Sequence, residues 1–339
     1  MSDKIRNIQP LGFPWKTADP FLFCVHHRDE YPQGNEEMGP AVNLAGRNMG
    51  SDFTVKDGFR MYHGMKVPGF PSHPHRGFET VTVTKEGIID HADSMGAAGR
   101  FGFGDVQWMT AGKGVQHSEM FPLLNRDKGN TLELFQIWLN LPSKSKMVQP
   151  YFSMFWHEKI PVIKHTDDVG RHSEIKIIAG NYNGQKALDP APESWAAEMD
   201  HEVGIWTIQL DAGAQLTLPA TQSIDTHRTL YFYQGTGLTL EGREIAPYHS
   251  IEVKSDEALT LQAGNSETHL LLLQGKPIKE PVVQHGPFVM NSAAEIQETM
   301  RDYGRTQFGG WPWPKSEQVH DRASGRFARH ADGREERPV

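Results

Sequence analysis

Short apolar segments separated by turn residues fill most of this chain and favour an all-β fold. In the second half, SEIKIIAG, EVGIWTIQL, RTLYFYQG and HLLLLQG follow one another at close spacing, with turn residues between them. That cadence indicates a sandwich or a small barrel. In the first half, residues 78–84 (FETVTVT) alternate in polarity, and residues 132–141 (LELFQIWLNL) are apolar on both faces, as in a strand covered on both sides.

The length of the chain and the position of one polar segment predict how it divides into domains. A chain of 339 residues suits two domains of ordinary size. The polar segment LPSKSKMVQP (141–150) is interpreted as an interdomain linker. We therefore expect an N-terminal domain at residues 1–140, a C-terminal domain at 141–290, and a helix followed by a polar tail at 291–339. The tail has few apolar anchors, so it is predicted to be mobile or to be an arm that orders only against another surface.

One helix is predicted near the end of the chain, over SAAEIQETMRDYGR (292–305). Ser292 is expected to cap its first turn, and Glu295 lies three residues on, as in a capping box. Gly304 is expected to end it, because glycine readily takes the left-handed conformation that follows many helices.

Charge and cysteine content exclude several classes of protein. The net charge of −8 argues against direct binding to a nucleic-acid backbone. The single cysteine, Cys24, rules out a disulfide framework within one chain and suggests a reducing, cytoplasmic location. No apolar run approaches the length that a membrane helix needs, and the first residues carry no apolar core of a signal peptide.

Two pairs of side chains suited to metal binding carry most of the functional information. His73 and His75 form one pair, and His117 and Glu119 form the other. Residues two apart on a strand point to the same face, so two adjacent strands would aim three imidazoles and a carboxylate at one point. Such a set suits Fe(II), Mn, Ni, Cu or Zn. Glu79 is a rival carboxylate, because it follows His75 by four residues and would share its face on a continuous strand.

A faint repeat relates the two halves. His75-Arg76 precedes a strand in the first half, and His227-Arg228 precedes one in the second. On that alignment, the second-half positions that match the four candidate ligands are Asp225, His227, His269 and Leu271. Because leucine cannot bind a metal, the C-terminal domain is expected to lack a complete metal site.

Three segments closely resemble the pirins, a family in the cupin superfamily. The segments are PSHPHRGFETVTV through HADSMGAAGRFGFGDVQWMTAGKGVQHSEM, FQIWLNLPSKSKM, and GPFVMNSAAEIQETMRDYGRTQFGGWPW. The resemblance ends near residue 313 and leaves the tail after Pro314 without a counterpart. It implies an all-β bicupin of two antiparallel, jelly-roll-like β-barrel domains with a C-terminal helix and a polar tail.

The resemblance also implies a ligand set and an activity. It assigns His73, His75, His117 and Glu119 to one divalent metal and places Glu79 outside this set. Fe(II) is the first expectation, with Mn, Ni, Cu, Zn or Co as alternatives. Pirins are similar to quercetin 2,3-dioxygenases, which implies an oxidoreductase that opens the central ring of a flavonol or related aromatic substrate with dioxygen. Glu119 or Glu79 would then take the hydroxyl proton of the substrate.

Two other functions stay open at this point. The family resemblance also implies a metal- or redox-responsive regulatory protein that acts on a protein partner. A metal-dependent isomerase or hydrolase would use the same fold without oxygen. Among the remaining polar residues, Arg76 is expected to orient a carboxylate or to form a surface ion pair, and His91 and Asp93 are expected in a turn.

Overall fold

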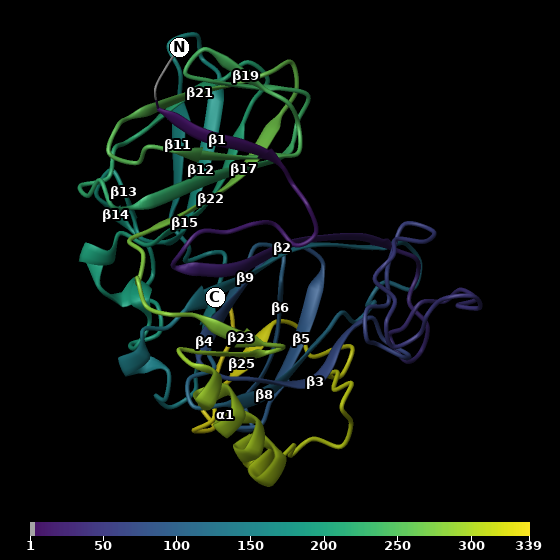
Figure 1. The fold of residues 1–339 in the computed structure, drawn as a ribbon. Helices are drawn as coiled ribbons and strands as arrows, with labels where there is room; N and C mark the ends of the chain where they lie inside the picture. Colours follow the sequence, from purple (N-terminus) through teal and green to yellow (C-terminus); the bar gives the residue numbers. More distant parts are fainter. Residues whose placement is uncertain (1–3) are drawn as a thin grey trace. The chain divides into compact units, whose positions relative to one another are not determined.

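The computed structural model describes residues 4–339, which form two compact units (Figure 1). The first unit runs to Cys24 and resumes at Lys159–Lys279, and the second comprises Val25–Glu158 and Glu280–Val339. The units therefore interleave along the chain and change over near residues 24, 158 and 279. The domain boundaries that the sequence suggests, at residues 140 and 290, remain predictions.

The first unit is a sandwich of two antiparallel sheets. Its larger sheet has the order β1 (Ile5–Pro10), β20 (His249–Val253), β17 (His227–Gln234), β22 (Thr268–Gly275), β15 (Gly204–Leu210), β12 (His172–Ala179) and β11 (Val162–Thr166). Its smaller sheet has the order β16 (Gln215–Leu218), β21 (Leu259–Ala263), β18 (Leu238–Leu240) and β19 (Arg243–Ile245). The hairpin β13 (Asn181–Tyr182) and β14 (Gln185–Lys186) and the 3₁₀ turns η2 (Trp195–Ala197) and η3 (Met199–His201) complete it.

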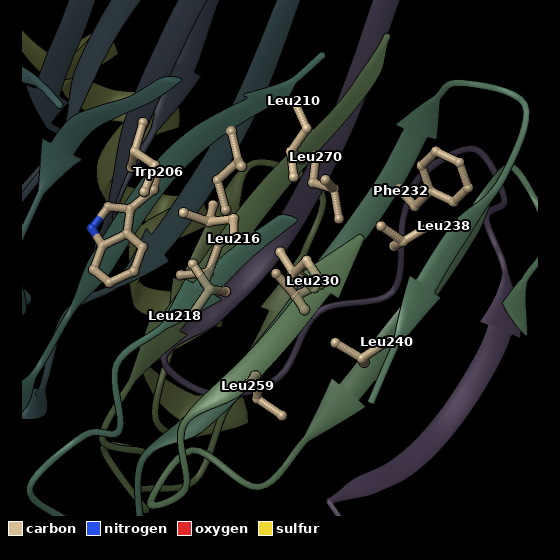
Figure 2. Close-up of a cluster of buried hydrophobic side chains, with 14 of the residues drawn as sticks. Trp206, Leu210, Leu216, Leu218, Leu230, Phe232, Leu238, Leu240, Leu259 and Leu270 are labelled. Atoms are coloured by element: carbon tan, nitrogen blue, oxygen red, sulfur yellow. The ribbon is translucent and has the colours of Figure 1, made fainter. Parts of the chain in front are cut away.

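Aliphatic side chains fill the space between these two sheets (Figure 2). The larger sheet contributes Leu230 and Leu270, while the smaller sheet contributes Leu216 and Leu259, and all four are fully or almost fully buried. Each strand places alternate residues on this inner face, as the period-two pattern of the sequence predicts.

The second unit has the same plan. One sheet has the order β10 (Tyr151–Phe155), β7 (Val106–Thr110), β4 (Phe78–Glu86), β9 (Asn130–Asn140) and β2 (Phe21–Tyr31). The other has the order β26 (Glu335–Glu336), β25 (Phe327–Arg329), β6 (Ala98–Gly102), β5 (Ile88–Asp93), β8 (Val115–Met120) and β3 (Gly69–His75). The hairpin β23 (Val283–His285) and β24 (Phe288–Met290) and the 3₁₀ turns η1 (Ser143–Ser145) and η4 (Gln307–Gly309) lie in this unit too.

The strands predicted in the first half are confirmed. Residues 78–84 lie in β4, and residues 132–140 lie in β9, which pairs with β4 and is largely buried on both faces. Gly112 and Gly114 have positive φ values of 48° and 128°, and these conformations let the chain reverse between β7 and β8.

The predicted helix is α1 (Ala293–Thr306). The Ser292 side chain accepts a hydrogen bond from the Glu295 backbone N–H at 3.3 Å, which confirms the N-terminal cap. The helix runs through Gly304 and ends at Thr306, so the expected stop is wrong by two residues. Gln307 takes the left-handed conformation there, with φ of 50°, and its N–H caps the carbonyl of Tyr303.

The tail after residue 314 lies as an arm along the second unit (Figure 1, yellow). Its strand β25 pairs with β6 through Phe327, Ala328 and Arg329. The sequence left open a mobile tail or an arm that orders against another surface. The structure has an ordered arm, and the surface against which it orders is β6 of the same chain.

The segment predicted as a linker is anchored within the second unit. Lys146 is buried, and its ammonium donates to the carbonyl of Gly77 at 2.8 Å, to Asn140 Oδ1 at 2.8 Å and to the carbonyl of Val289 at 3.1 Å. Three acceptors satisfy all three ammonium protons. The linker interpretation fails here because a polar segment can be fixed by backbone carbonyls rather than by apolar side chains.

The part of the chain that the structure describes contains no helix with the length and apolar character that a membrane crossing requires.

Candidate metal centre

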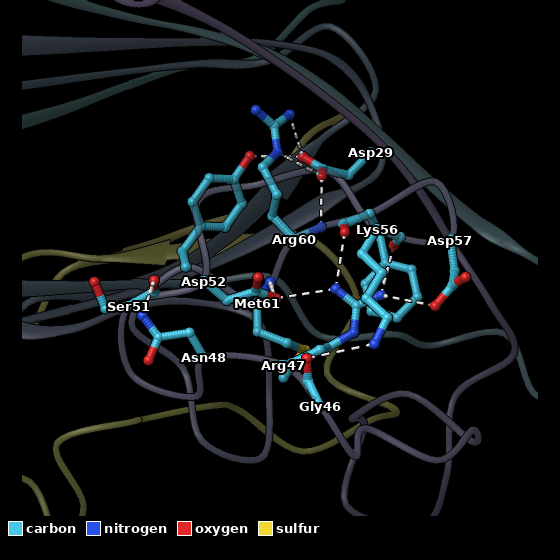
Figure 3. Close-up of polar contacts among 12 residues, drawn as sticks. Asp29, Gly46, Arg47, Asn48, Ser51, Asp52, Lys56, Asp57, Arg60 and Met61 are labelled. Carbon is cyan, nitrogen blue, oxygen red and sulfur yellow. Dashed lines mark hydrogen bonds and ion pairs between the residues drawn. The ribbon is translucent and has the colours of Figure 1, made fainter.

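A polar network fixes the loop that leads into β3 (Figure 3). The Arg60 guanidinium donates to Asp29 Oδ1 at 2.9 Å and Oδ2 at 3.0 Å, and the Tyr62 hydroxyl donates to Asp29 Oδ2 at 2.6 Å. The Tyr62 ring then packs against Phe70 of β3, with centroids 5.1 Å apart. Because Asp29, Arg60 and Tyr62 are buried, this network sets the path of the chain as it enters β3.

Strands β3 and β8 bring the two predicted pairs side by side. They are antiparallel neighbours, and His73 lies directly opposite His117. The ring centroids of His73, His75 and His117 are 4.5 to 4.9 Å apart, and their candidate ligand nitrogens lie within 4.8 Å of one another. Two nitrogens bound to one ion at about 2.1 Å are at most about 4.2 Å apart, so the imidazoles already sit close to the required spacing.

Glu119 lies beside this cluster, with its Oε2 atom 3.8 Å from His117 Nε2. The Thr82 hydroxyl of β4 donates to Glu119 Oε1 at 2.9 Å, and the Gln136 amide of β9 donates to Oε2 at 3.3 Å. Residues from the facing sheet therefore hold the carboxylate, while β3 and β8 carry the imidazoles.

The polar chain around Glu119 is best satisfied when that residue carries a proton. Thr82 Oγ1 also lies 2.7 Å from Gln136 Oε1, but a hydroxyl has one proton and cannot donate to both acceptors. As a neutral acid, Glu119 can donate to Thr82, which then donates to Gln136. Burial raises the pKa of Glu119 above its usual value, although the Thr82 hydrogen bond opposes this.

Burial keeps the three imidazoles neutral. It lowers the pKa of His73 to about 4 and the pKa values of His75 and His117 well below their usual range. The neutral form is the one that binds metals. His73 also donates from Nδ1 to the carbonyl of Pro71 at 2.8 Å, which directs its Nε2 lone pair away from the backbone.

Unsatisfied nitrogens provide the test of whether a metal fits. His75 Nδ1 and both ring nitrogens of His117 are buried without a hydrogen-bond partner in residues 4–339. Leaving such groups unpaired costs about 1–3 kcal/mol each. A metal ion coordinated by the histidines would remove part of that cost, so the residues present suit a divalent transition metal.

The structure separates the two candidate carboxylates. Strand β4 keeps a regular register from Phe78 to Thr84, so Glu79 and Thr82, three residues apart, face opposite sides. Thr82 points to Glu119, whereas Glu79 accepts a hydrogen bond from the Thr110 hydroxyl at 2.7 Å on the other side. The geometry therefore brings Glu119 to the imidazoles and keeps Glu79 away from them.

Sequence reasoning missed Thr82 and Gln136 and misplaced His91. His91 lies in β5 rather than a turn, opposite Glu119 in register, with its ring centroid 5.6 Å from that of His117. Its Nε2 atom lies 3.2 Å from Asp93 Oδ2. Gln136 could have been noticed as a polar residue within an apolar strand. The sequence does not show which strand lies opposite it, so its contact with Glu119 could not be predicted.

The C-terminal segment contacts the immediate neighbours of all three histidines. Arg76, next to His75, is buried and pairs with Asp302 of α1. Gln116, next to His117, donates from Nε2 to the carbonyl of Gln307 at 2.6 Å. Ser72, next to His73, donates from its N–H to the carbonyl of Ser316 at 2.9 Å. Helix α1 and the arm thus brace the strands that carry the candidate ligands.

A second group of potential ligands is already occupied by a cation of the chain. Asp105, His157 and Glu158 lie close together, and the Arg326 guanidinium donates to Asp105 Oδ1 at 2.8 Å and to His157 Nδ1 at 3.0 Å. Glu158 is also paired with Arg326. This group is therefore an ion-pair cluster that ties the arm to the rest of the second unit.

Comparison with known proteins identifies the family. The family model for pirin matches residues 12–139, and the model for the pirin C-terminal cupin domain matches residues 205–309. The pirin-like protein 2 of Arabidopsis thaliana is 36% identical over 312 residues, which cover 88% of this chain and 89% of that relative. The chain belongs to the pirin family.

Other pirin relatives carry enzymatic names. A Pseudomonas aeruginosa relative, 37% identical over 244 residues (71% of this chain and 79% of the relative), is named provisionally as a quercetin 2,3-dioxygenase. The crystal structure of an Acinetobacter baumannii quercetin 2,3-dioxygenase matches with a TM-score of 0.70 and 27% identity, covering 91% of this chain and 98% of that one. The bicupin fold is confirmed, with each unit formed by paired sheets rather than by a closed barrel in the region described.

The two pirin units also reveal which positions correspond. The sheet order β7-β4-β9-β2 matches β20-β17-β22-β15, and β3-β8-β5-β6 matches β16-β21-β18-β19. The counterparts of the histidine strands are therefore β16 and β21, where Leu216 lies opposite Leu261 and Leu218 opposite Leu259. The sequence alignment to Asp225, His227, His269 and Leu271 is wrong, because those residues lie on or next to the counterparts of β4 and β9.

Proposed function

We propose that this protein is a metal-dependent dioxygenase that opens the central ring of a flavonol or a related small aromatic substrate with dioxygen. One observation carries the proposal: buried, neutral imidazoles with unsatisfied nitrogens converge beside a carboxylate that can hold a proton. The relatives with quercetin 2,3-dioxygenase names support the reaction class. We place the protein in the cytoplasm, since its single cysteine suits a reducing compartment.

We assign His73, His75, His117 and Glu119 as the metal-binding group, with Fe(II) as the first choice and Mn, Ni, Cu, Zn or Co as alternatives. When bound, the ion would act as a Lewis acid on the 3-hydroxyl oxygen of the flavonol. The His73 contact with Pro71 orients one imidazole before substrate arrives.

Glu119 is the residue we assign to the proton of the substrate. In its ionised form it accepts the 3-hydroxyl proton, and Thr82 and Gln136 then stabilise the neutral acid. Burial raises the pKa of Glu119 in the site without an ion, whereas a bound cation would act in the opposite direction. Glu79 faces the other side of β4, so we assign it no part in proton transfer.

The test combines metal content with turnover. Protein from its native host should contain about one transition-metal ion per chain and should consume quercetin with matching oxygen uptake. His73→Ala should lose both metal and turnover, because it removes one imidazole from the cluster. His285→Ala is the matched control, since His285 is exposed in the same unit and should leave both unchanged.

Glu119→Gln separates proton transfer from metal binding. The amide keeps a coordinating oxygen but cannot accept the proton, so turnover should fall by about 10²-fold or more while metal is partly retained. Full turnover in this variant would contradict the role of Glu119. Stoichiometric metal without quercetin turnover in the wild-type protein would contradict the dioxygenase and favour regulation of a protein partner.

A further inference from the structure

The first unit contains a cavity of about 440 Å³ at one end of its sandwich. Apolar side chains contribute part of its lining, among them Trp206, Val203 and Pro219, and polar residues contribute the rest, among them Arg228, Gln274 and Lys276. This cavity belongs to the unit whose strands β16 and β21 carry leucines in place of the histidines. It therefore has no part in the metal centre.

Arg228 supplies a buried positive charge to this cavity, with only 2% of its surface exposed. Its Nε atom donates to Gln274 Oε1 at 2.8 Å, and its Nη1 atom donates to the carbonyl of Pro219 at 2.9 Å. A guanidinium has five N–H donors, so these two contacts leave three, including both on Nη2. No residue among 4–339 accepts a hydrogen bond from Nη2, and Arg228 is one of the residues that line the cavity.

The acids around the cavity do not pair with Arg228. Glu202 is the carboxylate whose charge acts on it, but the oxygens of Glu202 accept hydrogen bonds from the N–H groups of Gln222 and Ser223 at 2.6 and 3.1 Å. Asp189 pairs with Lys186 at 3.0 Å. Glu198 and Asp200 are exposed to solvent at the rim, where water screens them. Lys276 adds a positive charge to the lining.

We propose that this cavity binds a small organic carboxylate, held by the free N–H groups of Arg228 and packed against Trp206. A planar guanidinium edge matches a carboxylate through two parallel hydrogen bonds. The apolar lining favours a ligand with a hydrocarbon or aromatic body rather than a bare inorganic anion. The proposal concerns a second binding site and does not depend on the dioxygenase activity.

The protonation chemistry of Arg228 agrees with this assignment. Burial lowers the pKa of Arg228 to about 10, while Glu202 opposes the shift. The guanidinium remains charged at neutral pH, and Glu202 offsets only part of the cost of burying it. A carboxylate in the cavity would offset more of that cost.

Benzoate is the probe, and benzamide, which has the same shape without the charge, is its control. Calorimetric titration of the full-length protein should show saturable benzoate binding that is roughly tenfold or more tighter than benzamide binding. Arg228→Gln should lower the affinity for benzoate by at least about tenfold. Arg228→Lys should give an intermediate loss of affinity, because lysine keeps the charge but lacks the planar pair of N–H donors. Arg243→Gln is the matched control, since Arg243 is exposed in the same unit.

Three outcomes would overturn the proposal. They are the absence of saturable benzoate binding to the wild-type protein, equal binding of benzoate and benzamide, and inorganic phosphate displacing benzoate at lower concentration than benzoate itself requires. Near-UV circular dichroism establishes that each variant is folded. If Arg228→Gln does not fold, Arg228→Lys provides the test. Unchanged benzoate affinity in Arg228→Lys would contradict the proposal that two guanidinium N–H groups hold the carboxylate.

Discussion

At the scale of single residues, the candidate metal centre depends on polar side chains placed on inward-facing strand positions. Thr82 and Gln136 occupy places where the alternation of β4 and β9 directs side chains into the sandwich. Both hold Glu119, and neither is a predicted ligand. Outer contacts of this kind typically change metal affinity by about 10–100-fold when they are removed.

Replacing Thr82 with valine should weaken metal binding by about tenfold, because Glu119 would lose its 2.9 Å hydrogen bond while the shape of the side chain is kept. Competition with a chelator measures the affinity. Thr80→Val is the matched control: Thr80 shares the strand and the face, and its buried hydroxyl makes no hydrogen bond in residues 4–339. An equal loss in both variants would mean that Glu119 needs no help from Thr82.

Glu133 makes stability depend on pH. Burial alone would raise the pKa of Glu133, but the hydrogen bonds and charges of His26 and Lys85 outweigh it and lower the pKa to about 2. A carboxyl with a lowered folded-state pKa contributes stability above its unfolded value, and that stability is lost as the pH falls from about 4.5 toward 2. Between pH 6 and pH 3 the loss should be about 1–2 kcal/mol.

Urea unfolding at several pH values checks this dependence. Glu133→Gln should flatten the decline of the unfolding free energy between pH 6 and pH 3 by that amount. Glu86→Gln is the control, because Glu86 lies opposite Glu133 in register and is exposed. A decline as steep in Glu133→Gln as in the wild-type protein would show that other groups carry it.

The ligand spacing was visible in the sequence, but the choice between carboxylates was not. The X-x-X pairs at His73 and His117 predicted their own convergence, because alternation on strands is fixed by geometry. Glu79 seemed equivalent to Glu119 only if one strand ran unbroken from His75. Gly77, with φ of 88°, lies between β3 and β4, so Glu79 belongs to a new strand with its own facing.

At the scale of elements, the strands present the candidate ligands and the C-terminal segment holds those strands in place. Arg100 of β6 links the two, since it pairs with Asp90 at 2.7 Å and donates to the carbonyls of His320 and Asp321 at 3.0 and 2.7 Å. Both Arg100 and Asp90 are fully buried. Without the arm, a buried guanidinium would lose several of its acceptors.

Deleting residues 315–339 should lower the unfolding free energy by about 3 kcal/mol or more, because buried donors lose their acceptors at about 1–3 kcal/mol each. Metal release should be several-fold faster, since Ser72 next to His73 loses its contact with Ser316. Stopped-flow chelation measures the release. A chain ending at Arg329 is the control, because it keeps β25 and the carbonyls that bind Arg100. Equal behaviour of the two truncations would contradict the bracing role of the arm.

The elements themselves could be read from the sequence better than their boundaries and partners. The alternation of FETVTVT and the cap at Ser292 predicted β4 and the start of α1, because both depend on local chemistry. The helix passed Gly304 since one glycine costs only about 1 kcal/mol within a helix. The anchoring of Lys146 could not be predicted, because the carbonyls that it contacts belong to segments far away in the sequence.

At the scale of the whole molecule, two units of similar plan have different inner faces. In one, β3 and β8 carry histidines, and in the other their counterparts β16 and β21 carry leucines. The same sheet order thus supports a polar centre in one unit and an apolar core in the other. The sequence predicted two β-rich halves but aligned them through His75-Arg76 and His227-Arg228, a short local match that the strand order overrules.

Metal removal should act on one unit only. Binding of an ion at 1,000 times its dissociation constant adds about 4 kcal/mol to the state that binds it. Chelation should therefore speed hydrogen exchange in β3 and β8, while β17 and β22 exchange at unchanged rates. Exchange followed by mass spectrometry resolves these strands. Equal acceleration in both units would show that the ion stabilises the molecule as a whole.

Because the second unit is completed only by the last part of the chain, its contacts form in a fixed order during synthesis. Ser72, Arg76 and Gln116 leave the ribosome long before their partners Ser316, Asp302 and Gln307 are translated. A nascent chain that has released both histidine pairs still lacks the segments that brace them. If the proposed site binds its ion, stable capture is therefore expected as a late step in the maturation of the protein, after translation has passed residue 316.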